Sequence, residues 1–214
     1  MPPPRELTTT SYAVLGLLSV QPWTTYELAK QVRRSLNWFW PRAERKLYDE
    51  PKRLVDHGLA TATREHTGKR GRTVYRITDR GREALAQWLG EPAAPPTTEF
   101  EGMVKVFFAD GGSREQLLVS LDLIEAQAAE RLAAIDEMAG TRPAPFPERA
   151  HLSALGLRLQ HDQEQATLAW ARWARDQVRL WVAADDPGSW DANEVLDEIA
   201  RSGRVSLPPS GTGT

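Results

Sequence analysis

Apolar residues near the start of the chain recur at the spacing of a helix. Tyr12, Leu15 and Leu18 follow one another at helical intervals, with Val14 on the flank. Thr8 to Thr10 offer N-cap candidates, and Pro22 cannot continue a helix. The pattern predicts a first helix over the segment SYAVLGLLSV.

A second helix is predicted over the segment TYELAKQVRRSL. Either Thr24 or Thr25 caps its start. Leu28, Val32 and Leu36 lie one turn apart, so they form its inner face.

A third helix is predicted over residues 41–58, where Pro41 suits the first turn and Gly58 the position after the last. Winding this segment at about 100° per residue separates an apolar side from a mainly cationic side. The apolar side comprises Ala43, Leu47, Pro51, Leu54 and Val55. The opposite side comprises Arg42, Arg45, Lys46, Asp49, Lys52, Arg53 and Asp56.

Pro51 conflicts with a continuous third helix, because a proline disfavours helical backbone at the residue before it. Two interpretations are open. Either the helix is kinked at Pro51, or a short turn is followed by a new helix with Asp49 as its cap.

A β-hairpin is expected next, because the helical repeat gives way to alternation. The segment LATATREH is rich in β-branched residues, TGKRGR is a turn bounded by glycines, and TVYRIT alternates with period two. Thr78 or Asp79 then caps a fourth helix, DRGREALAQWLG, with Leu85, Trp88 and Leu89 on its inner face.

The remainder of the chain is predicted to be helical. Ser113 and Gln116 form a capping box that opens a helix of about two dozen residues. Its apolar stripe is Leu117, Leu121, Ile124, Ala128, Leu132, Ile135 and Met138. A long helix over residues 148–183 follows, with an apolar stripe of Leu152, Leu155, Leu159, Ala166, Trp170, Ala174 and Trp181. A last short helix, WDANEVLDEIARS, either packs back or frays.

Composition adds a division of the chain by charge. Residues 1–90 hold 16 basic and 9 acidic side chains, and residues 91–214 hold 11 and 20. This asymmetry indicates that only the first part meets a polyanion, the alternative being chance surface composition. A linker is predicted over residues 91–99, in the proline-rich segment GEPAAPPTTE. Residues 203–214 are predicted to be a disordered tail.

The chain has no cysteine, no apolar run long enough for a membrane span and no signal-peptide pattern at its start. We therefore expect a cytoplasmic protein with no membrane partner. The four histidines lack metal-ligand spacing, and phosphate-loop and serine-hydrolase motifs are missing. No enzyme activity, metal or cofactor is expected.

The order of three helices, a hairpin with a cationic tip and a fourth helix is that of a winged helix-turn-helix. Its third helix fits the major groove, and the tip can reach the DNA backbone. Tyr48 either contacts a phosphate or packs on the second helix. The candidate DNA contacts are Thr24, Thr25, Tyr26, Lys30, Arg42, Arg45, Lys46, Tyr48, Lys52, Lys69, Arg70 and Arg72.

The stretches TTYELAKQV, KLYDEPKRLVDHGLA and GRTVYRITDRGREAL resemble the PadR family of transcriptional regulators. The positions that match are Tyr26, Leu47, Tyr48, Lys52, Arg53, Leu54, Gly58, Tyr75, Arg76, Thr78, Gly81 and Arg82. Pro51 and Ile77 stand where leucine is usual. The start VFFAD…S-x-E-Q of the second part resembles the branch of the family with a large helical C-terminal domain.

The resemblance implies a homodimer that binds an inverted-repeat operator in double-stranded DNA, usually as a repressor, and in some members a small aromatic or hydrophobic effector. The expected fold is mainly α with a small β-hairpin, a winged helix-turn-helix over residues 1–90 and a helical dimerisation domain over residues 100–202. Candidate dimerisation residues are Phe100, Met103, Phe107, Leu117, Leu121, Leu155, Leu159 and Trp170.

Tryptophans admit two interpretations. Trp38, Trp40 and Trp173 are candidates for an effector pocket, but tryptophan on a helix stripe more often belongs to a core or a dimer interface. An alternative function also stays open: a winged-helix protein interaction module that does not bind DNA. Such a module has no reason to concentrate cations on the third helix and the hairpin tip.

Overall fold

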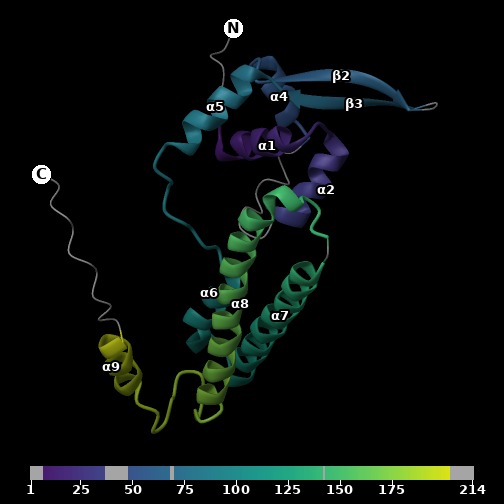
Figure 1. The fold of residues 1–214 in the computed structure, drawn as a ribbon. Coiled ribbons are helices and arrows are strands. Elements are labelled where there is room, and N and C mark those ends of the chain that lie inside the picture. The colour runs from purple at the N-terminus through teal and green to yellow at the C-terminus, as the bar shows by residue number, and fades with distance from the viewer. Residues whose placement is uncertain (1–6, 37–47, 68–69, 142, 203–214) are drawn as a thin grey trace, which may run out of the picture. The chain divides into compact units, whose positions relative to one another are not determined.

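The computed structural model describes residues 7–36, 48–67, 70–141 and 143–202. The chain forms two compact units, Met1–Pro96 and Thr97–Thr214. Most of the described chain is helical, with one small antiparallel sheet in the first unit (Figure 1). Within the described ranges, no helix is long and apolar enough to cross a membrane.

The first two helices begin at reciprocal caps. Helix α1 (Thr9–Val20) starts after Thr8, whose side chain and that of Ser11 form a capping box. Helix α2 (Thr25–Ser35) starts after Thr24, which forms a second box with Glu27. The choice between Thr24 and Thr25 is therefore settled in favour of Thr24.

The core of the first unit gathers apolar side chains from α1, α2, α4 and the three strands. The side chains that the sequence predicted on the inner faces of α1 and α2 are buried in this core. Tyr12 and Leu36 are only partly buried. The buried apolar side chains of this unit are Val14, Leu15, Leu18, Trp23, Leu28, Ala29, Val32, Leu54, Leu59, Ala60, Val74 and Tyr75.

Helix α4 (Glu50–Asp56) is shorter than the third helix predicted for this region, of which residues 41–47 lie outside the described residues. Asp49 stands at the N-cap position without a side-chain hydrogen bond, and Pro51 lies in the first turn. Because the first N–H groups of a helix have no partner inside it, a proline there removes no hydrogen bond. Of the two interpretations, the new helix start is the one observed. Gly58 follows with a positive φ of 70°, as expected for its position.

The sheet has three strands in the order β1-β3-β2. Strands β2 (Ala60–Thr67) and β3 (Arg70–Ile77) form the predicted hairpin, which projects from the helices of its unit (Figure 1). Strand β1 (Trp23–Thr24) was not predicted, and it pairs Trp23 with Tyr75. The start of α2 is thereby fixed to the base of the hairpin.

Helix α5 (Asp79–Leu89) begins after Thr78, which accepts a hydrogen bond from the Gly81 N–H. A Cβ at Gly81 would lie 2.1 Å from the Leu59 carbonyl oxygen, so only glycine fits there. Trp88 stacks on Tyr12 at 4.8 Å and joins α5 to α1. Leu89 is exposed, so its predicted place on the inner face was wrong. Leu89 is the last residue of the helix, and Gly90 is its C-cap.

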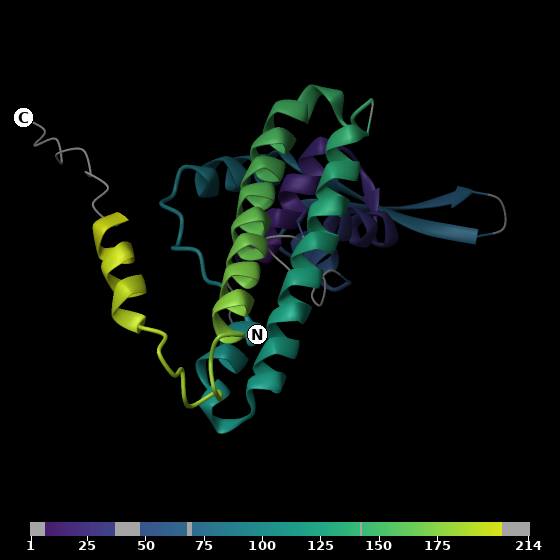
Figure 2. The same cartoon turned by 90° about the horizontal axis from the view of Figure 1, so that it is seen from below.

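The second unit is built on two long helices that lie side by side (Figures 1 and 2). They are α7 (Arg114–Gly140) and α8 (Ala150–Val178), preceded by α6 (Glu101–Phe107) and the short turn η1 (Ala109–Gly111). The turn η2 (Pro147–Arg149) precedes α8, and α9 (Ala192–Ser202) comes after α8. Ser113 and Gln116 form the capping box predicted for α7.

Ion pairs and a shared core hold α7 against α8 in antiparallel orientation. Arg131 pairs with Glu164 at 3.1 Å and Arg172 with Glu125 at 2.7 Å, while Arg175 also contacts Glu125. The predicted stripe of α7 is buried as far as Ile135. One core cluster comprises Leu117, Leu121, Ala174 and Val178.

The apolar stripe predicted for α8 does not pack against α7 over its first half. Leu152, Leu155 and Leu159 are exposed, and the residues buried on α8 are Gln160, Ala171, Ala174 and Val178. Small alanines let α7 approach closely, so this face rather than the leucine face packs inward. The helix also ends at Val178, five residues before the predicted end, and Trp181 lies beyond it.

Candidate nucleic-acid interface

The start of α2 presents exposed side chains beside an anchored cap. The Thr24 hydroxyl accepts from the Glu27 N–H at 3.2 Å and lies 2.8 Å from Glu27 Oε2, to which it donates. Its hydrogen bonds are therefore used inside the chain. Tyr26 and Lys30, four residues apart on one side of α2, are exposed, and Thr25 is half-buried.

Glu27 connects the start of α2 with the charge of the hairpin. The Thr24 backbone N–H, followed by the Thr24 hydroxyl, holds the pKa of Glu27 below its ordinary value of 4.5. The positive charge of Arg72 lowers it further. Glu27 is thus ionised at neutral pH, and its negative charge attracts the positive charge of Arg72.

Arg72 and Arg76 on β3 share one carboxylate of β2. Glu65 lies 3.1 Å from a guanidinium nitrogen of each, and Glu65 is the cross-strand partner of Arg72. These pairs are exposed, so each contributes little to stability and can be exchanged for a phosphate contact. Arg64 on β2 is exposed as well. We call Arg64, Arg72 and Arg76 the wing cations.

The other predicted contacts of the hairpin and third helix are only partly described. Lys69, Arg42, Arg45 and Lys46 lie outside the described residues, and the side chain of Arg70 is not described. Tyr48 is 59% exposed, which favours a phosphate contact over packing on the second helix. Lys52 on α4 is exposed.

A buried carboxylate at the start of α4 was missed by the sequence analysis. Glu50 is only 3% exposed and accepts a hydrogen bond of 2.5 Å from the Ser11 hydroxyl. Arg53 approaches the same carboxylate at 3.4 Å. Glu50 lies three residues after Leu47 and four before Leu54, so helical spacing already placed it on the apolar side.

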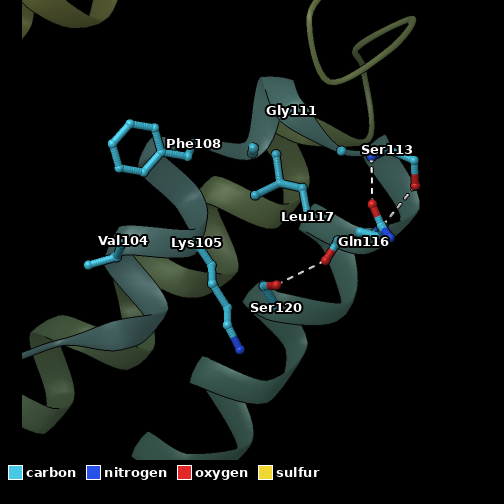
Figure 3. A pocket seen from close by; sticks show the side chains of 10 residues that line it. Val104, Lys105, Phe108, Gly111, Ser113, Gln116, Leu117 and Ser120 are labelled. Carbon is cyan, nitrogen blue, oxygen red and sulfur yellow. Dashed lines mark hydrogen bonds between the residues drawn. The ribbon is translucent and has the colours of Figure 1, made fainter.

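The second unit contains a hollow of about 440 Å³ between α6, η1 and the start of α7 (Figure 3). Val104, Phe108 and Leu117 line it together with Lys105, whose amine pairs with Glu101 at 3.1 Å. Trp173 is not among the lining residues and is exposed on α8, while Trp38 and Trp40 lie outside the described residues. Of the three candidates, only Trp173 is therefore placed, and it lies outside this hollow.

The candidate dimerisation residues divide into two groups. Leu117 and Leu121 are buried in the core of their own chain, so the structure corrects their assignment to a surface for a partner. Phe107, Met103, Leu155 and Leu159 are exposed, while Phe100 and Trp170 are half-buried.

Comparisons with known proteins agree with this architecture. Residues 14–87 match the model of the transcriptional regulator PadR-like family, and residues 101–179 match the virulence activator alpha C-terminal domain. The negative transcriptional regulator PadR of Bacillus subtilis is 30% identical over 132 residues, which cover 61% of this chain and 71% of that protein.

Two solved structures share the fold. Bacillus subtilis PadR in complex with operator DNA superposes with a TM-score of 0.68 at 23% identity, over 80% of this chain and 99% of that one. Bacillus subtilis PadR in complex with p-coumaric acid gives a TM-score of 0.60 at 24% identity, over 84% and 98%.

The likeness to PadR in both parts of the chain does not favour the interaction module without DNA binding. The capped helices and the hairpin of the first unit form a winged-helix fold, and the second unit is a helical C-terminal region. The chain belongs to the PadR-like family of transcriptional regulators.

Proposed function

We propose that this chain is a repressor that binds an inverted-repeat operator as a homodimer. The observation that supports this most directly is the set of exposed cations on the first unit, namely the wing cations on the hairpin, Lys30 on α2 and Lys52 on α4. Lysine and arginine on such a surface displace counterions from phosphates and supply most of the non-specific affinity. The relatives named for negative regulation and solved with operator DNA support the same proposal.

In this proposal α4 and the residues before it enter the major groove, and the wing cations contact the adjoining backbone. Two such units in a dimer read half-sites about 34 Å apart, which is one turn of DNA. Bound dimers then block access to the promoter. Exposed apolar residues of the second unit, among them Phe107, Leu155 and Leu159, supply the dimer surface.

A small aromatic or hydrophobic effector would release the protein from DNA. The relative solved with p-coumaric acid supports this part of the proposal. Intrinsic fluorescence of the eight tryptophans gives the measurement. A panel of aromatic acids should contain a compound that changes the emission and weakens operator binding, and a flat response throughout the panel would argue against an effector of this class.

The regulator proposal is tested by a gel shift with DNA from upstream of the gene, at low salt. We expect a discrete retarded complex that survives an excess of unrelated DNA of equal length. Complete lack of a shift at low salt would contradict DNA binding. A complex that unrelated DNA competes away equally well would contradict a specific operator.

A further inference from the structure

Glu65 is the only acidic residue in the basic sequence of the hairpin. Residues 60–77, which span strands β2 and β3, include five Lys and Arg residues and this one carboxylate. A hairpin that contacts phosphates gains affinity from each basic side chain, whereas a carboxylate repels the same phosphates. The place of Glu65 among the cations therefore needs a physical explanation.

Two arginines of β3 converge on the Glu65 carboxylate. Arg72 Nη2 donates to Glu65 Oε2 and Arg76 Nη2 donates to Glu65 Oε1, each at 3.1 Å. Arg72 lies directly opposite Glu65 in the register, but Arg76 lies opposite Thr61, four residues away on β2. Four residues of a strand span about 13 Å, so Arg76 must extend along the hairpin to reach the carboxylate. The register alone does not impose this second pair.

Two guanidinium groups around one carboxylate also form an arrangement that suits a phosphate. Arginine recognises both anions in the same way, because each offers oxygens that accept its N–H groups. The side chains of Arg72 and Arg76 are 50% and 49% exposed, so DNA can reach them, and that of Glu65 is 31% exposed. Such exposed ion pairs are weak, and a phosphate can therefore replace the carboxylate.

The cations of the neighbouring helices are not held in this way. Lys30 on α2 and Lys52 on α4 are exposed, and neither forms an ion pair with another residue of the described ranges. The restraint by a carboxylate thus acts on Arg72 and Arg76 of the hairpin and not on these two lysines.

We propose that Glu65 is an internal competitor of the DNA phosphates, which holds Arg72 and Arg76 and thereby limits the affinity for unrelated DNA. The inference rests on DNA binding through the hairpin, which is part of the proposed function. When the hairpin reaches a duplex, the two arginines exchange the carboxylate for phosphates, and the released carboxylate is repelled by the same backbone. Unrelated DNA binds through charge alone and has no base contacts to offset this cost.

Glu65→Gln tests the proposal, because it removes the charge but keeps the size of the side chain and one acceptor oxygen. The full-length protein is titrated against a labelled duplex of unrelated sequence, and fluorescence anisotropy gives the affinity at several salt concentrations. We expect the affinity at low salt to rise about threefold or more. The slope of log affinity against log salt should steepen by about one unit for each hairpin in contact with DNA. Circular dichroism should show an unchanged fold.

Glu83→Gln is the matched control, since it removes the same charge from the same unit, at the hollow between α1 and α5. It should leave the salt slope unchanged. A further pair of chains carries both Arg72→Ala and Arg76→Ala, with and without Glu65→Gln. In that background, Glu65→Gln should change the affinity no more than Glu83→Gln does, because the groups that it would release are missing.

The sign of the change separates competition from a positioning role. An affinity or a slope that falls in Glu65→Gln overturns the proposal, because Glu65 then orients the arginines for the phosphates. Equal gains in Glu65→Gln and Glu83→Gln also overturn it, since the effect is then one of net charge. If the wild type binds and Glu65→Gln gains nothing, the inference fails while the proposed function stands. Binding by neither protein at low salt overturns both.

Discussion

Glu50 carries a carboxylate into the core of the first unit, where its partners come from two elements. Ser11 of α1 donates to it, and the Ser11 hydroxyl also accepts from the Thr8 N–H at 2.9 Å. Ser11 therefore completes the cap of α1 and also binds Glu50, the first residue of α4. A buried acceptor that loses its donor costs more than the hydrogen bond gains, because it has no water to replace the donor.

We expect Ser11→Ala to destabilise the protein by about 2 kcal/mol, since it leaves the Glu50 carboxylate without its short hydrogen bond. Urea unfolding followed by circular dichroism measures the loss. Ser19→Ala is the control in the same helix, because the Ser19 hydroxyl donates only to the Gly16 carbonyl at the half-buried end of α1. Equal losses for the two variants would contradict a special role for the contact with Glu50.

Glu27 makes part of the stability depend on pH. Its pKa is lowered in the folded state, chiefly by the Thr24 backbone N–H. A carboxyl with a lowered pKa contributes stability above its unfolded pKa and loses it as the pH falls through the folded value. Wild-type stability should therefore fall as the pH drops below 4.5, the ordinary value for this group.

The variant Glu27→Gln keeps a capping-box side chain but cannot ionise. Its unfolding temperature should depend less on pH below that value, so that the two proteins converge in acid. Thermal unfolding at a series of pH values provides the measurement. Parallel curves for the two proteins would show that Glu27 does not titrate with folding.

Elements were predictable where the pattern was long and local. The capping box at Ser113 and the buried stripe of α7 follow from spacing alone, whereas the cap of α2 was predicted only as Thr24 or Thr25. Strand β1 did not, because two residues are too short to alternate and their partner Tyr75 lies far along the chain. The contact of Glu50 with Ser11 likewise joins residues that become neighbours only in the fold.

Helix α8 shows that an apolar stripe can be predicted without knowing which of its residues are buried in the monomer. Its periodicity does not say whether an apolar side faces the same chain or a partner. The side with Ala171 and Ala174 packs on α7, whereas Leu152, Leu155 and Leu159 are exposed on another side of α8. The sequence therefore identified apolar residues on α8 but not which of them are buried in the monomer.

The hairpin should carry a measurable share of the phosphate contacts. Arg72→Ala removes one wing cation, so the slope of log affinity against log salt should become shallower by about one unit. Operator binding at several salt concentrations gives the slope. Arg80→Ala is the control of equal charge, because Arg80 lines a hollow between α1 and α5 and not the hairpin. An unchanged slope for Arg72→Ala would remove it from the contacts.

Charge divides the whole molecule as clearly as the fold does. Basic residues exceed acidic ones in residues 1–90, and acidic residues exceed basic ones in residues 91–214. Because phosphates attract the first part and repel the second, the charges alone favour DNA binding through the winged helix. In the proposed homodimer, two basic first units would contact one duplex.

This arrangement predicts a strict dependence on operator geometry. Inserting about five base pairs between the half-sites turns the second half-site to the opposite side of the duplex. We expect binding to fall to that of an operator with a single half-site, as measured by fluorescence anisotropy. Substituting the same number of central base pairs without changing the length is the control. Undiminished affinity after the insertion would mean that the two half-sites are not read by one rigid dimer.

The pairing of β1 with β3 also has a consequence for how the chain folds. Trp23 meets Tyr75 across a long stretch of sequence, whereas α7 and α8 meet through a short connection. Distant contacts close slowly and local helical ones quickly, so the second unit should gain its structure faster than the first. During synthesis, the start of α2 cannot be fixed until β3 has left the ribosome. The first unit, although it is synthesised before the second, would then complete its folding after it.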